Sequence, residues 1–131
     1  VDAVLIDAPC SATGTIRRHP DIPHLKQLEG VRRMAKIQSR LVASAARMVR
    51  PGGHLIYAVC SMQPEEGARV INKFLLANTG FSRDPLQEDD HSIPSDFRTK
   101  NGDIQTLPCH WPELGGLDGF FAARLVRHAA S

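Results

Sequence analysis

The feature that most constrains the fold is an apolar run near the start of the chain that stops at a proline. Val4-Leu5-Ile6 has the composition of a buried strand, and Asp7 and Pro9 end it, because proline has no N–H to donate to a sheet. Cys10 therefore lies on the loop at the carboxyl end of a strand. In open α/β sheets this edge carries ligands and chemistry.

A second apolar run, residues 54–60, ends at another cysteine, Cys60. Neighbouring parallel strands lie about 4.8 Å apart, so residues at their carboxyl ends can face one site. We therefore expect Asp7, Cys10 and Cys60 to converge. The alternative is that cysteine is a small apolar residue that packs well in strands. That alternative suits a lone cysteine better than this pair, in which each cysteine is followed by serine.

The spacing of apolar residues predicts helices after both strands. Intervals of three, four and seven residues predict a helix over residues 24–50, and Pro64 is placed to begin a second helix. The pattern in the first helix is formed by Val31, Met34, Leu41, Ala45 and Met48. A strand–helix–strand–helix order followed by short strands predicts half of a doubly wound α/β sheet.

Three short strands are expected in the second half of the chain, near residues 81–85, 105–108 and 119–126. Successive side chains of the last strand point to opposite faces, which places Phe121, Ala123 and Leu125 on one face. We expect Phe120 and Phe121 to belong to the core rather than to a base-stacking platform, because both flanks continue an apolar strand.

Composition and cysteine usage restrict the class of protein. The chain has 131 residues, enough for one domain with a core, and no apolar run approaches the roughly 20 residues of a membrane span. Its three cysteines form no CxxC pair, which argues against a disulfide framework and for a reducing compartment. Cys109 and His110 offer too few ligands for a metal. We expect a cytoplasmic protein without a membrane partner or a metal.

The distribution of charge says more about partners than the net charge of +2 does. Arg17, Arg18 and His19 form three consecutive potential cations beside the expected site, which suits contacts with the phosphates of a nucleic acid. A solvated loop is the alternative. A buried strand that begins at residue 1 has nothing before it to cover its flank. We therefore expect the carboxyl-terminal part of a larger protein, and self-association of the isolated chain through its exposed first strand.

Several short motifs occur in an order that identifies a family. They are Asp7-Ala-Pro-Cys-Ser-Ala-Thr-Gly14, Arg17-Arg-His-Pro-Asp21, Arg50-Pro-Gly-Gly53, Val59-Cys-Ser61, Pro64-Glu-Glu66 and Asp118-Gly-Phe-Phe121. Together they resemble the Sun/RsmB-type S-adenosylmethionine-dependent RNA (cytosine-5)-methyltransferases, from residue 1 to about residue 127 and most weakly across 82–103. Two positions depart from the family pattern: Val59 stands where Thr is usual, and Gly67 where Asn is usual.

The resemblance implies a fold and the part of the catalytic domain to which this chain corresponds. It implies a Rossmann-like class I methyltransferase sheet, with parallel strands and an antiparallel last strand, of which residues 1–131 are the carboxyl-terminal half. The cofactor loop and the amino-terminal RNA-binding domain of the family have no counterpart in this sequence. We therefore expect the isolated chain to be inactive and to bind S-adenosylmethionine weakly.

The resemblance also implies site residues. Cys60 matches the nucleophile, Cys10 matches the cysteine that assists breakdown of the covalent adduct, and Asp7 matches the acid near the cofactor and the target base. Asp7, Ala8 and Pro9 are expected to border the cofactor. The chemistry explains the residue type, because only a soft, readily ionised nucleophile both adds to C6 of cytosine and leaves again.

The expected substrate is RNA, and the expected reaction is methyl transfer from S-adenosylmethionine to C5 of a cytosine. The motif that begins at Arg17 favours 16S ribosomal RNA over transfer RNA, on resemblance alone. Two alternatives stay open at this point. One is a transfer RNA cytosine-5 methyltransferase, and the other is a catalytically inactive module that binds RNA through Arg17, Arg18 and the basic helix.

Overall fold

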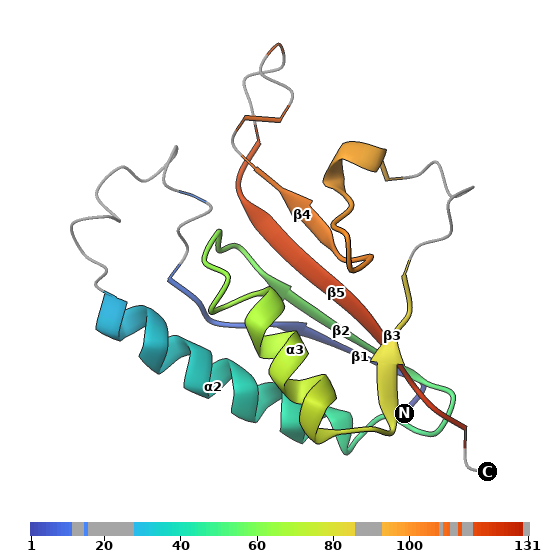
Figure 1. Ribbon diagram of the computed structural model, residues 1–131. Coiled ribbons are helices and arrows are strands. Elements are labelled where there is room, and N and C mark those ends of the chain that lie inside the picture. Colours follow the sequence, from blue (N-terminus) through green and yellow to red (C-terminus); the bar gives the residue numbers. More distant parts are fainter. Residues whose placement is uncertain are drawn as a thin grey trace.

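The computed structural model describes residues 1–11, 15, 28–85, 93–107, 109–110, 113 and 117–129. Its elements are β1 (Ala3–Asp7), α2 (Leu28–Ala46), β2 (His54–Val59), α3 (Ala68–Ala77), β3 (Phe81–Arg83), the 3-10 helix η2 (Ser95–Phe97), β4 (Ile104–Thr106) and β5 (Phe120–Arg127) (Figure 1). The basic cluster at Arg17, Arg18 and His19 lies outside the described residues, so its contact with phosphate stays a prediction.

The strands form one mixed sheet with the order β1-β2-β5-β3, and β4 also pairs with β5. β1 and β2 are parallel, with Asp7 opposite Ala58. β5 runs antiparallel to β2, and β3 and β4 both pair with β5 in antiparallel fashion. β1 to β4 therefore run in one direction and β5 runs against them. This arrangement confirms the predicted parallel strands with an antiparallel last strand.

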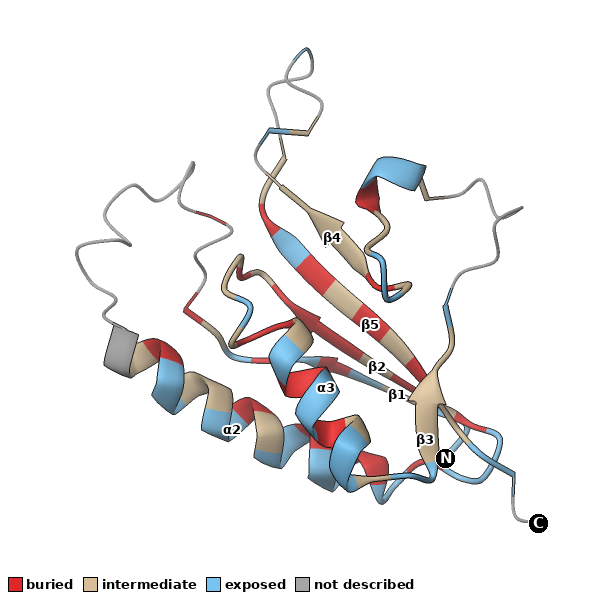
Figure 2. Cartoon of the chain, in the orientation of Figure 1, coloured by how far each residue is buried: buried red, intermediate tan, exposed pale blue. Residues whose placement is uncertain are grey.

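Helices α2 and α3 cover one face of this sheet (Figures 1 and 2). The core lies between them and the strands, and its fully buried side chains include Leu55, Tyr57, Val59, Ile71 and Leu125. Alternation along β5 turns Phe121, Ala123 and Leu125 inward as expected. Phe120 is 37% exposed on the opposite face, so the prediction that both phenylalanines belong to the core is wrong for Phe120.

Both helices differ from their predicted versions. α2 ends at Ala46, and its buried stripe contains Gln38 and Val42, whereas Met48 is 54% exposed. The second helix begins at Ala68, so the prediction that Pro64 is its first residue is wrong. Residues 64–67 form a separate turn, closed by a hydrogen bond from the N–H of Gly67 to the carbonyl oxygen of Pro64.

A tight turn sets the register of the first two strands. Gly52 has φ +80°, and a Cβ added to Gly53 would lie 2.7 Å from the carbonyl oxygen of Asp2. The N–H of His54 donates to that same oxygen at 2.9 Å. Leu5 is 69% exposed because it lies on the face of β1 that α2 does not cover (Figure 1). The glycines thus let the end of the turn approach β1 closely enough to start the parallel pairing.

Candidate active site

The carboxyl ends of β1 and β2 bring the two cysteines together. The N–H of Ala8 donates to the carbonyl oxygen of Ala58 at 3.0 Å, which extends the parallel pairing by one residue beyond β1. The loops that follow carry Cys10 and Cys60, whose Sγ atoms lie 3.5 Å apart in a partly buried position. The convergence of these two side chains, expected from the strand order, is observed. Their separate chemical roles stay predictions.

Asp7 lies three residues before Cys10, at the carboxyl end of β1. As the last residue of β1 it is exposed, on the face that also carries Leu5, opposite to the face that packs on α2. Within the part of the chain that the structure describes, no hydrogen bond or ion pair engages the Asp7 carboxylate. The structure therefore leaves this carboxylate available to a ligand at the edge of the sheet.

The backbone after Asp7 is held by α2 and β2. Ala8 is buried, and the carbonyl oxygen of Pro9 accepts a hydrogen bond of 2.8 Å from Nε2 of Gln38. Gln38 is itself fully buried, which an apolar periodicity could not predict. This contact fixes the loop one residue before Cys10.

The sequence pattern missed Glu66 as a site residue. Its carboxylate is fully buried and accepts hydrogen bonds from the Ser11 N–H at 2.9 Å and from the Ser11 hydroxyl at 2.9 Å. Ser11 and Ser61, each the residue after a site cysteine, have their Oγ atoms 3.5 Å apart. The repeated Cys-Ser pair was the available signal, because two polar residues beside buried strands need polar partners.

Tyr57 on β2 supports the same cluster. Its hydroxyl donates to the carbonyl oxygen of Glu66 at 2.5 Å, and its side chain is fully buried. Burial raises the pKa of Tyr57 well above its ordinary value, and the charges of Glu66 and Cys10 raise it further. The phenol is therefore a permanent neutral donor that ties the turn at residues 64–67 to the sheet.

Two departures from the expected family pattern lie next to this cluster. Val59 is fully buried in the apolar core, where a hydroxyl would need a partner. A Cβ added to Gly67 would lie 3.1 Å from Cγ of Phe121, so the ring must shift to admit an asparagine there. Val59 directly precedes Cys60, and Gly67 directly follows Glu66 and packs against the ring of Phe121.

Chemically, the site offers two thiols in contact at the edge of a sheet, with a free carboxylate nearby. A cysteine thiolate adds readily to a soft electrophilic carbon, and a second group at this distance can act on the resulting adduct.

The sequence model of the family 16S rRNA methyltransferase RsmB/F matches residues 1–126. This chain belongs to the RsmB/F family.

Curated relatives of this RsmB/F chain agree with that assignment. Ribosomal RNA small subunit methyltransferase B of Klebsiella pneumoniae (strain 342) is 40% identical over 126 residues, which cover 96% of this chain and 26% of the relative. The protein of the same name from Thermus thermophilus is 37% identical over 124 residues, which cover 95% of this chain and 29% of the relative. The chain thus spans little more than a quarter of the length of these relatives.

Solved structures share the RsmB/F chain's fold. The crystal structure of PH0851 superposes with a TM-score of 0.82 at 35% identity, over 97% of this chain and 27% of that one. NSun6 from Pyrococcus horikoshii, determined with SFG, gives a TM-score of 0.70 at 24% identity, over 97% and 30%. The predicted family resemblance and the Rossmann-like fold class are confirmed. In the described residues, no helix has the length and apolar character needed to span a membrane.

Proposed function

We propose that this chain is the carboxyl-terminal part of the catalytic domain of a cytoplasmic S-adenosylmethionine-dependent RNA (cytosine-5)-methyltransferase that acts on 16S ribosomal RNA. The observation that carries the proposal is the pair of cysteine sulfurs 3.5 Å apart at the carboxyl edge of two parallel strands. The names of the relatives support ribosomal RNA of the small subunit as substrate. Their greater length supports a partial catalytic domain.

The proposed mechanism divides the work between the two cysteines. The thiolate of Cys60 forms a bond to C6 of the cytosine, and the ring electrons move to C5, which becomes nucleophilic. After methylation a base removes the proton from C5, the electrons return to the ring, and the bond between Cys60 and C6 breaks. Cys10, with its sulfur 3.5 Å from that of Cys60, assists this second stage. The target cytosine must leave any stack of bases so that its face is exposed to Cys60.

S-adenosylmethionine supplies an electrophilic methyl group when it is bound. The residues present fit its cationic part, since the exposed carboxylate of Asp7 complements a positive charge and lies at the edge of the sheet. The same carboxylate, if near N3 and N4 of the base, selects cytosine and stabilises the activated ring. Pro9 is exposed and contributes surface rather than a hydrogen bond, because its carbonyl oxygen already accepts from Gln38. Ala8 is buried and borders the cofactor only through its backbone, whose N–H is already paired with Ala58.

Arg17, Arg18 and His19 are proposed to contact RNA phosphates beside the target nucleotide. Positive side chains in this role give affinity without sequence preference. The alternative of a transfer RNA substrate lacks support from the names of the relatives. The alternative of an inactive RNA-binding module gives no reason for the two sulfurs to meet.

We also propose that the isolated chain self-associates through β1. This strand is terminal in the described sheet, and Leu5 and Val1 are each more than two-thirds exposed. Open apolar strands pair with other chains. Light scattering should detect dimers or larger species of the purified chain, and a stable monomer at high concentration with β1 uncovered contradicts this proposal.

The reaction is tested with the complete protein that contains this chain, S-adenosylmethionine carrying a labelled methyl group, and purified RNA. We expect label in 5-methylcytosine after digestion of 16S ribosomal RNA, and none with the Cys60→Ser variant. Label found only in transfer RNA would show that transfer RNA, and not 16S ribosomal RNA, is the substrate. RNA binding without any methyl transfer would leave the inactive module as the better account.

A further inference from the structure

Glu66 is a buried acid whose carboxylate has Ser11 as its hydrogen-bonding partner among the described residues. Its side chain is fully buried, and its two oxygens accept from the N–H and the hydroxyl of Ser11, with a third distance of 3.3 Å from that N–H to Oε2. No ion pair with Glu66 occurs among the residues that the structure describes. A buried carboxylate needs such hydrogen bonds to stay in place.

The other end of Glu66 is fixed to the sheet. Its carbonyl oxygen accepts from the hydroxyl of Tyr57 at 2.5 Å. The next residue, Gly67, lies so close to the ring of Phe121 that an added Cβ would be 3.1 Å from Cγ. The backbone at residue 66 is therefore anchored to β2 and β5, while its side chain reaches across 55 positions of sequence to Ser11.

From these contacts we infer that Glu66 is a positioning residue that holds the sulfur of Cys10 against that of Cys60. Ser11 directly follows Cys10, and its hydroxyl also lies 3.5 Å from that of Ser61, which follows Cys60. Glu66 acts through the two serines, because its carboxylate accepts from Ser11 and the Ser11 hydroxyl lies beside that of Ser61. For the catalytic consequence this inference rests on the proposed function. The geometric consequence stands without it.

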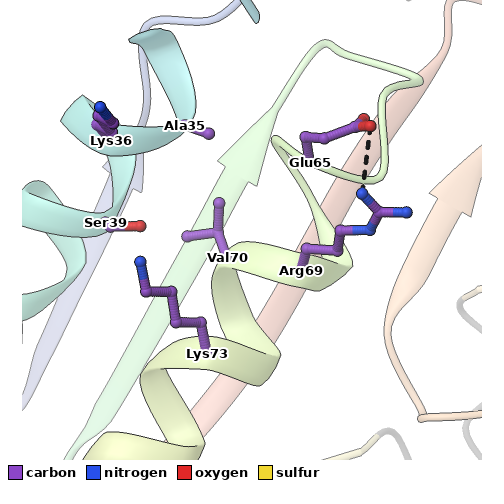
Figure 3. A pocket seen from close by; sticks show the side chains of 7 residues that line it. All are labelled: Ala35, Lys36, Ser39, Glu65, Arg69, Val70 and Lys73. Carbon is purple, nitrogen blue, oxygen red and sulfur yellow. Dashed lines mark hydrogen bonds and ion pairs between the residues drawn. The ribbon is translucent and has the colours of Figure 1, made fainter. Parts of the chain in front are cut away.

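The neighbouring acid provides a matched control. Figure 3 shows Glu65 pairing with Arg69 along the start of α3, in the groove between α2 and α3 that Lys36 and Lys73 also line. The pair is 3.3 Å long; the Arg69 side chain is exposed, whereas the Glu65 side chain is partly exposed and its Oε2 is buried without a hydrogen-bond partner among the described residues. Glu65→Gln therefore changes charge by the same amount, one residue away, without touching the loop of Cys10.

The closeness of the sulfurs can be measured through disulfide formation. An azodicarboxamide oxidant such as diamide takes up two electrons and two protons and becomes a hydrazine, while the two thiols lose them and form one S–S bond. The rate reports how well the sulfurs are held together, because it depends on their effective concentration. Cys109 is exposed and outside the site, so a Cys109→Ser background leaves the pair as the only cysteines of residues 1–131, and peptide mapping of the oxidised complete protein identifies the Cys10–Cys60 bond.

In that background we expect Glu66→Gln to slow formation of the Cys10–Cys60 disulfide by about tenfold or more, because one donor of Ser11 loses its acceptor. Glu65→Gln should leave the rate unchanged. Circular dichroism verifies that each variant is folded. If Glu66→Gln does not fold, Ser11→Ala takes its place and should slow the reaction several-fold, while Ser11→Thr keeps the hydroxyl and the parent rate. A parent rate in folded Glu66→Gln or in Ser11→Ala overturns the inference.

A second readout links positioning to catalysis. In the complete protein, Glu66→Gln should lower kcat for methyl transfer and leave KM for RNA near the parent value, since the side chain is not available to RNA. A slower disulfide reaction in a protein that transfers no methyl group would retain the inference and reject the proposed function. An unchanged disulfide rate with normal methyl transfer would reject the inference and retain the proposed function.

Discussion

Raising the pH above the usual range of tyrosine should destabilise this molecule, and Tyr57 should ionise only as the molecule unfolds. Tyr57 is the single tyrosine of the chain, is fully buried, and donates its hydroxyl hydrogen to the carbonyl oxygen of Glu66. Burial, followed by the charges of Glu66 and Cys10, holds the pKa of Tyr57 well above the value of a free side chain. A phenolate in this place would face an acceptor and lose its hydrogen bond.

The sign and size of the effect follow from proton linkage. The folded state holds the phenolic proton more tightly than the unfolded chain, in which the pKa is about 10. The corresponding stability is fully present below pH 10 and is lost as the pH rises toward the folded value. Each pH unit above 10 lowers the free energy of unfolding by about 1.4 kcal/mol, so about 2.7 kcal/mol is gone at pH 12. This is a large share of a typical domain stability of about 5–15 kcal/mol.

The assay follows phenolate absorbance and far-ultraviolet circular dichroism over the same alkaline titration. Because the chain has a single tyrosine, the change in phenolate absorbance reports Tyr57 alone. We expect the phenolate signal and the loss of helix to rise together. Tyr57→Phe removes the titrating group, so its stability should fall less between pH 10 and pH 12, although losing the hydroxyl costs about 1–3 kcal/mol at neutral pH. A phenolate signal with a midpoint near pH 10 and native circular dichroism would refute the reasoning.

Two further predictions concern the turn before β2 and the basic loop. Gly53→Ala places a Cβ 2.7 Å from the carbonyl oxygen of Asp2, so it should lower the free energy of unfolding by about 1–3 kcal/mol, while Gly80→Ala, with open space around it, serves as control in the same denaturant titration. Arg17→Ala and Arg18→Ala should each weaken RNA binding and reduce the slope of log affinity against log salt by about 1. An unchanged slope in both would exclude phosphate contacts there.

The cysteine pair could be predicted because local rules and topology agree. Proline ends the first strand, a helix leads to the second, and parallel neighbours must then present Cys10 and Cys60 at one edge. The inward face of β5 was predictable for a similar reason, since alternation alone decides it. In both cases the deciding information lies within a few residues of the element.

Glu66 was not predictable because its place depends on a distant partner. Pro64 and two acids satisfy the rules for a helix start as well as those for a turn. The hydrogen bonds to Ser11, 55 positions away in sequence, favour the turn and draw one acid inward. Gln38 is a second example, since its burial depends on the carbonyl oxygen of Pro9, which no periodicity of apolar residues contains.

The most direct test of the account is covalent capture of RNA on a denaturing gel. The complete protein, with S-adenosylmethionine and labelled 16S ribosomal RNA, is compared in three variants: Cys10→Ala, Cys60→Ser and Cys109→Ser as the control outside the site. If Cys60 attacks C6 and Cys10 assists its departure, Cys10→Ala accumulates a protein–RNA species that survives denaturation, Cys60→Ser forms none, and Cys109→Ser behaves as the parent. An adduct in Cys60→Ser but not in Cys10→Ala would reverse the two roles, and the absence of any adduct and of any effect on methylation in both variants would contradict the covalent mechanism.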